Sequence, residues 1–119
     1  MTKAEMIQRT RAFALRVVHL VDPLPTESTG TIRGRLFWRC GTSVAANYRA
    51  ACRAKSKADF INKLKIVEEE CDESIYWMEL IVAAKLVLKT KLGPLTSEAP
   101  ELLSIVVAAI RTTRANRKS

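Results

Sequence analysis

Residues 35–53 read RLFWRCGTSVAANYRAACR, a stretch without proline in which basic and apolar residues recur at helical spacing. At about 100° per residue, the two kinds of side chain separate onto opposite faces of a helix. The basic face spans about 80° and holds Arg35, Arg39, Thr42, Ala46, Arg49 and Arg53. The apolar face holds Leu36, Phe37, Cys40, Val44, Asn47, Tyr48, Ala51 and Ala54. The stretch predicts an amphipathic helix over about 31–55 whose small residues let another helix approach closely.

Three more segments of helical periodicity surround this one. The segment at about 3–21 repeats apolar residues at steps of three and four. The segment at about 57–91 follows Ser56, a typical N-cap, and ends before Gly93-Pro94. A last segment covers about 98–116. Four amphipathic helices with short connections predict an all-α fold, an antiparallel up-and-down four-helix bundle.

Length and composition limit the other possibilities. The 119 residues suit one domain over 1–119, and only four Gly and four Pro are too few for the turns of a β-sandwich or barrel. A chain of this size has a modest core, which a partner chain can extend. Three cysteines without C-x-x-C spacing predict reduced core thiols, and the polar N-terminus does not resemble a signal peptide. We therefore expect a cytoplasmic protein with no membrane span.

Charge suggests the kind of partner. Twenty Lys and Arg against twelve Asp and Glu give a formal net charge of +8, which favours nucleic acid, an acidic protein or an anionic surface. Between Arg33 and Lys57 there are seven basic residues and no acid. Arginine suits phosphate because its planar group donates two parallel hydrogen bonds. Candidate nucleic-acid contacts are Arg35, Arg39, Arg49, Arg53, Arg111, Arg114, Arg117 and Lys118. The alternative is pairing of these arginines with the acidic run at 68–73.

The sequence offers few residues that could form a catalytic or metal-binding site. The only histidine, His19, lies on a different helix from the acidic run, which argues against a Glu-x-x-His metal site and severely restricts any catalytic triad. We expect no catalytic residues, no metal and no cofactor. Asn47 is expected to bond across the bundle, with Ser43 or Ser74. Four aromatic residues favour the core or a subunit interface, with base stacking as the alternative: Trp38, Tyr48, Tyr76 and Trp77.

Three blocks carry a family resemblance: RCGTSVAANYR at 39–49, RAKSKADFINKL at 53–64 and ECDESIYWMEL at 70–80. They resemble the bacterial four-helix-bundle proteins encoded in intervening sequences of large-subunit ribosomal RNA genes. The resemblance covers most of residues 5–110. It implies an antiparallel four-helix bundle and a ring-shaped homopentamer, and it brings no catalytic residues.

A related member, the accessory variability protein of diversity-generating retroelements, is a basic pentamer that binds nucleic acid and a reverse transcriptase. Relatives often carry Glu where this chain has Ala50, which leaves the second helix wholly basic. The leading hypothesis is a non-enzymatic oligomeric scaffold that binds RNA or DNA through this basic face. The alternative is an adaptor whose basic face docks an acidic protein, such as a reverse transcriptase.

Overall fold

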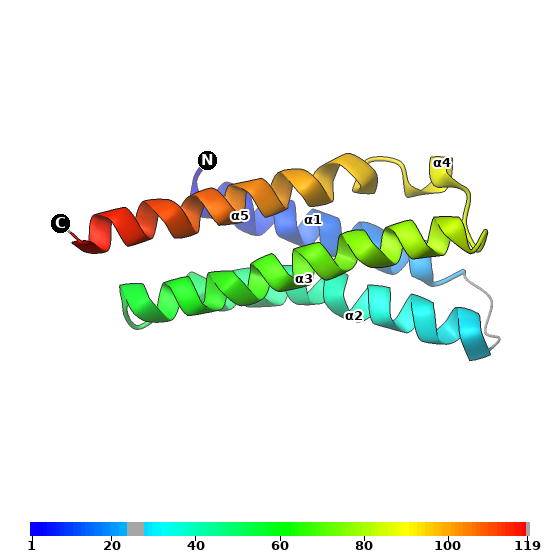
Figure 1. The fold of residues 1–119 in the computed structure, drawn as a ribbon, viewed down its shortest axis with the longest axis horizontal. Helices are drawn as coiled ribbons and strands as arrows, with labels where there is room; N and C mark the ends of the chain where they lie inside the picture. Colours follow the sequence, from blue (N-terminus) through cyan, green and yellow to red (C-terminus); the bar gives the residue numbers. More distant parts are fainter. Residues whose placement is uncertain (24–27, 119) are drawn as a thin grey trace.

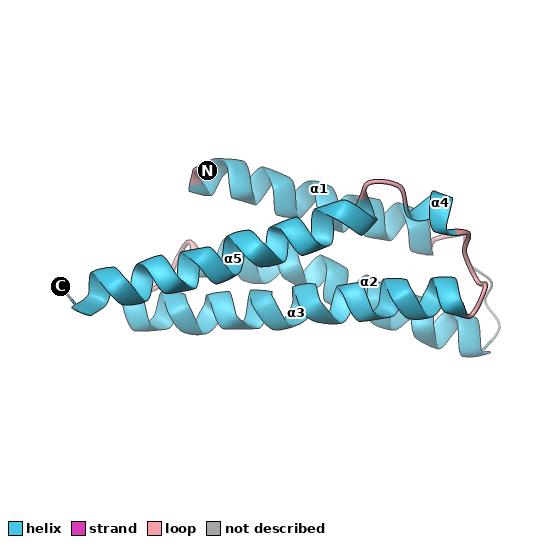
Figure 2. Cartoon of the chain, turned by 45° about the horizontal axis from the view of Figure 1, so that its top comes forward, coloured by secondary structure: helices cyan, strands magenta, loops and turns pink. Residues whose placement is uncertain are grey.

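The computed structural model describes the backbone of residues 1–23 and 28–118 and the side-chain surroundings of 1–23 and 34–116. Its five helices are α1 (Lys3–Val21), α2 (Ser28–Ala51), α3 (Lys57–Ala83), the single-turn α4 (Lys89–Leu92) and α5 (Leu95–Lys118). The described backbone contains no strand, which confirms the predicted all-α fold (Figure 2). Within the same residues, no helix combines the length and the hydrophobicity needed to cross a bilayer.

The four long helices lie alongside one another, with consecutive long helices running in opposite directions (Figure 1). α2 packs against both α1 and α3, and α5 packs against α3 and, less extensively, against α1. The molecule measures 52 × 22 × 21 Å. The α2–α3 turn and the C-terminus lie at one end, and α4 lies at the other (Figure 1). A residue's position along its helix therefore decides which end of the molecule it occupies.

The core receives side chains from all four long helices, as their periodicity requires. Its fully buried members are mainly aliphatic and aromatic, and include Phe13, Val17, Phe37, Val44, Leu64, Ile81, Leu102 and Val106. Each helix turns one apolar stripe inward because burial removes that surface from water. The opposite stripe of each helix is left outside the core.

α1 packs closely on α2 where α2 has a glycine. A Cβ atom added at Gly41 would lie 2.8 Å from Cγ2 and 2.9 Å from Cγ1 of Val17. Val17 is fully buried, and its β-branched side chain has little rotamer freedom. Gly41 therefore occupies a position at which the Val17 side chain leaves no room for a Cβ atom.

We expect Gly41→Ala to lower the free energy of unfolding by about 1–3 kcal/mol, because overpacking at a rigid contact outweighs the helix propensity gained by alanine. Urea unfolding followed by circular dichroism measures the change. Val17→Ala opens space at the same contact. The loss of unfolding free energy in the double variant should therefore be smaller than the sum of the losses in the two single variants. A stabilised Gly41→Ala variant would contradict the close approach.

The prediction of one helix over 57–91 is wrong at its C-terminal end. α3 stops at Ala83, and the backbone N–H groups of Lys85 and Leu86 donate to the carbonyls of Val82 and Ile81. This pairing is a Schellman motif, in which the residue after the cap adopts a left-handed conformation. Lys85 does so, with φ of 60°. The helix was expected to continue until just before Gly93, because glycine is the residue that usually adopts this left-handed conformation at the end of a helix.

The other long helices also differ from their expected bounds. α2 spans Ser28–Ala51 rather than 31–55, because Asp59 accepts the backbone N–H of Lys55 and Ser56 caps α3 instead. α5 spans Leu95–Lys118 rather than 98–116 and contains Pro100 in its second turn. The carbonyl that proline leaves without a helical donor belongs to Thr96, an exposed residue.

Candidate nucleic-acid interface

The packing of α2 sets which of its side chains face solvent. Its apolar face is buried, with Phe37, Cys40 and Val44 all fully inaccessible. The four arginines of the predicted basic face are all exposed: Arg35, Arg39, Arg49 and Arg53. The structure therefore places Arg35, Arg39 and Arg49 on the outside of α2, and Arg53 in the turn just after its last residue.

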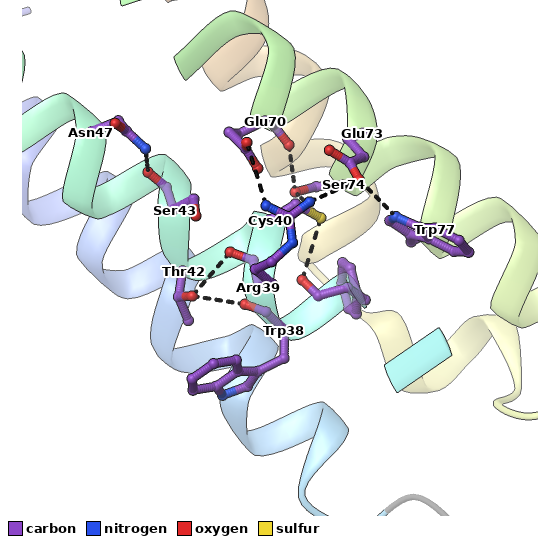
Figure 3. Close-up of polar contacts among 11 residues, drawn as sticks. Trp38, Arg39, Cys40, Thr42, Ser43, Asn47, Glu70, Glu73, Ser74 and Trp77 are labelled. Carbon is purple, nitrogen blue, oxygen red and sulfur yellow. Dashed lines mark hydrogen bonds and ion pairs between the residues drawn. The ribbon is translucent and has the colours of Figure 1, made fainter. Parts of the chain in front are cut away.

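Arg39 differs from the other three because it pairs with α3. One of its guanidinium nitrogens lies 3.1 Å from Oε1 of Glu73, and the other lies 3.8 Å from Oε1 of Glu70 (Figure 3). The guanidinium is still half exposed. Arg39 thus joins α2 to the acidic run, as the alternative interpretation supposed. Among the described residues, Arg35, Arg49 and Arg53 form no such ion pair.

The two carboxylates that face Arg39 have different surroundings. Glu73 Oε1 also accepts a 3.3 Å hydrogen bond from Nε1 of Trp77. Glu70 is largely buried, and its Oε2 has no hydrogen-bond partner in the described structure. Burial raises the pKa of Glu70, and the nearby Arg39 charge offsets part of that rise. The ionised form of Glu70 is therefore incompletely compensated and destabilises the α2–α3 contact.

Because the pKa of Glu70 is higher in the folded than in the unfolded chain, its ionisation opposes folding at neutral pH. That cost disappears as pH falls through the folded pKa toward the unfolded value. We expect Glu70→Gln to raise the free energy of unfolding at pH 7 by up to about 1 kcal/mol. Its advantage over wild type should shrink as pH falls toward the ordinary glutamate range. Denaturant unfolding at several pH values measures both effects.

Glu73→Gln is the matched control, since it weakens the better-formed pair with Arg39 and should lower stability by about 1 kcal/mol or less. If Glu70→Gln instead lost stability to the same extent as Glu73→Gln, Glu70 would be an effective partner of Arg39. The account of Glu70 as an incompletely compensated charge would then be wrong.

Arg49 and Arg53 line a shallow hollow that the sequence did not indicate. It measures about 380 Å³ and is lined by Ala46, Arg49, Ala50, Arg53 and Lys63. Lys63 comes from α3 and is held 2.6 Å from Asp59, one turn earlier. Two alanines in the lining leave room for an anionic group between the cations. Lys63 was missed because its own segment gives no sign of which face lies beside α2.

The C-terminal arginines lie toward the same end of the molecule. Arg111 and Arg114 are exposed in the last two turns of α5. That part of α5 and the end of α2 both lie at the end with the α2–α3 turn (Figure 1). The side chains of Arg117 and Lys118, also predicted contacts, lie outside those that the structure describes.

Beneath Arg39, α2 and α3 meet through small polar groups. The Ser74 hydroxyl lies 3.3 Å from Cys40 Sγ and donates to the Glu70 carbonyl (Figure 3). The cysteines are free, and burial raises the pKa of Cys40 to about 11 and that of Cys71 to about 12. Both thiols are protonated and unreactive at neutral pH.

The expected cross-bundle bond of Asn47 is not formed. Its Nδ2 donates to the backbone carbonyl of Ser43, one turn earlier in α2, at 2.9 Å. Ser74, the other expected partner, is engaged with Cys40 and Glu70. Asn47 is only partly buried, so a bond within its own helix suffices.

The aromatic residues divide into two groups. Tyr48 is buried, and Trp77 is partly buried against the core and contacts Tyr76 edge to face at 5.2 Å. Trp38 and Tyr76 are exposed, by 43% and 55%. Of the two expected roles, a place in this chain's core is excluded for Trp38 and Tyr76 by their exposure, while a place at a subunit interface stays a prediction.

No feature of the described chain points to catalysis. His19 is exposed, and the described residues contain no group of three or more His, Cys, Asp or Glu able to hold a metal. A hollow of about 400 Å³ between α3, α4 and the start of α5 has a mostly apolar lining, with Glu79 and Lys89 as its charged residues. It lacks the convergent polar groups of an enzyme pocket.

Comparisons with known proteins agree with this architecture. Residues 2–108 match the family model described as the 23S rRNA-intervening sequence protein. A solved structure from Bacteroides thetaiotaomicron, described as a protein of unknown function from the S23 ribosomal protein family, is similar with a TM-score of 0.85 and 31% identity. The similarity covers 93% of this chain and 99% of that one. No curated protein matches the chain.

Proposed function

This chain belongs to the 23S rRNA-intervening sequence protein family, and we propose that it is a non-enzymatic scaffold that binds RNA or DNA through the outer face of α2. The observation that carries the proposal is the exposure of Arg35, Arg49 and Arg53 together with their lack of acidic partners. All three are exposed, and none forms an ion pair with a described residue. Unpaired guanidinium groups are available to phosphate oxygens, to which they donate two parallel hydrogen bonds.

The spacing of these cations suits a repeating anion. Arg35 and Arg49 are separated by about 21 Å along the axis of α2, at 1.5 Å per residue, and Arg53 lies in the turn just after the helix. A nucleic-acid backbone presents phosphates along such a length, whereas a single small anion would contact one cation group at most. Arg111 and Arg114 are exposed on α5, a helix that packs on α3 and α1 rather than on α2, and they add a second, separate group of cations. Binding of this kind gains its affinity from released counterions and weakens as salt rises.

We expect Arg49→Glu/Arg53→Glu to weaken binding of a labelled RNA or DNA oligonucleotide by about tenfold or more at low salt. The slope of log affinity against log salt should fall by about two, because two phosphate contacts are lost. Fluorescence anisotropy at several salt concentrations measures both quantities. Circular dichroism confirms that the variant remains folded.

The control is Lys89→Glu/Lys91→Glu, which changes the net charge by the same amount at the opposite end of the molecule. It should leave affinity nearly unchanged. Equal losses in the two variants would mean that net charge alone drives binding. If wild type binds neither RNA nor DNA at low salt, the proposal fails, and a protein captured after nuclease treatment would instead support the adaptor.

We further propose that four-helix protomers assemble into a homopentamer. The number five rests on the family resemblance alone. The need for a partner rests on exposed apolar side chains of α3, since Ile66 is 42% and Tyr76 is 55% exposed. A second copy packed over these residues would bury them.

Light scattering should give a particle five times the 13.3 kDa protomer mass. Ile66→Glu/Tyr76→Glu should dissociate it, because charged side chains at a subunit contact lose hydration without gaining partners. A monomeric wild type would contradict the assembly. Assembly that survives both substitutions would show that the contact lies elsewhere.

A further inference from the structure

We propose that Trp38 is a stacking platform for an unpaired base, so that the ligand of α2 is a single-stranded nucleic acid. This inference rests on the proposed binding function and specifies its substrate. Trp38 is 43% exposed, although tryptophan is a residue that proteins usually keep mostly covered. Its indole makes no hydrogen bond to a described residue and is not among the side chains packed on the core.

Trp38 lies on the same side of α2 as the unpaired arginines. Arg49 follows Trp38 by eleven residues. The two side chains therefore differ by about 20° in direction around the helix axis and lie about 16 Å apart along it. Arg35 precedes Trp38 by one turn and is exposed. Figure 3 shows the indole pointing away from Arg39 and its contacts with α3. A strand bound along the arginines therefore passes over the Trp38 ring.

The chemistry of stacking distinguishes between the possible ligands. In a duplex, neighbouring base pairs cover both faces of each base, so an indole on the protein surface has no ring face to stack on. In a single strand, a base can turn its π-face toward tryptophan while its phosphates contact arginine. The combination of one exposed indole with flanking guanidinium groups thus favours an unpaired strand. Stacking is tolerant of base identity, so little sequence preference is expected.

A second tryptophan, Trp77, would obscure the fluorescence of Trp38. The chain has two tryptophans, so Trp77→Phe leaves Trp38 as the sole indole fluorophore. Trp77 lies on α3, is partly buried against the core and donates to the Glu73 carboxylate, whereas the Trp38 indole points away from these contacts. Titration of this variant with a single-stranded RNA of about 15 nucleotides should quench the Trp38 emission. The same RNA annealed to its complement should leave the emission unchanged.

Affinity provides the second measurement. Trp38→Ala should weaken binding of the single strand by about tenfold and binding of the duplex by less than about twofold. Trp38→Phe, which keeps an aromatic face, should recover most of the single-strand affinity. Circular dichroism and the thermal midpoint check that both variants fold as wild type does.

The outcomes separate this inference from the function on which it rests. If Arg49→Glu/Arg53→Glu abolishes binding but Trp38→Ala affects single strand and duplex equally or neither, nucleic-acid binding stands and the stacking role is wrong. Quenching of Trp38 by the duplex as strong as that by the single strand would also overturn it. If neither nucleic acid binds, both proposals fail.

Discussion

The rotation of α2 about its own axis is the constraint on which the rest of the structure depends. Two contacts set it from opposite sides. Gly41 packs on Val17 of α1 without room for a side chain, and Cys40 meets Ser74 of α3 beneath the Arg39 pairs. Since both neighbours fix the same helix, its apolar face must point inward. Arg35, Arg49, Arg53 and Trp38 are consequently held outward.

Charge is distributed according to the same geometry. The acidic run on α3 and the basic face of α2 come from adjacent helices, yet only Arg39 reaches across to Glu70 and Glu73. Among the described residues, Arg35, Arg49 and Arg53 form no ion pair. Lys63 adds a cation from α3 beside Arg49 and Arg53. The protein thus has a local positive surface rather than a diffuse excess of charge, and such a surface favours a polyanion over a small ligand.

The sequence predicts the helices well and their ends less well. Apolar periodicity identifies the four long helices because burial of one stripe per helix decides where they form. The end of α3 was missed because Lys85 adopts the left-handed conformation usual for glycine. The basic face was predicted from spacing alone, but the pairing of Arg39 and the role of Lys63 depend on which faces of α2 and α3 meet. The exposure of Trp38 likewise depends on how α2 is rotated about its own axis against α1 and α3.

The most direct test of the account is ultraviolet cross-linking of the protein to a bound single-stranded RNA, with the attached peptides located by mass spectrometry. Short-range cross-links report which side chains contact the bases, independently of any substitution. The account predicts attachment within α2, at the peptide that contains Trp38, with further sites near Arg49 and Arg53. Cross-links confined to α1 or to the outer side of α3, with none on α2, would contradict it.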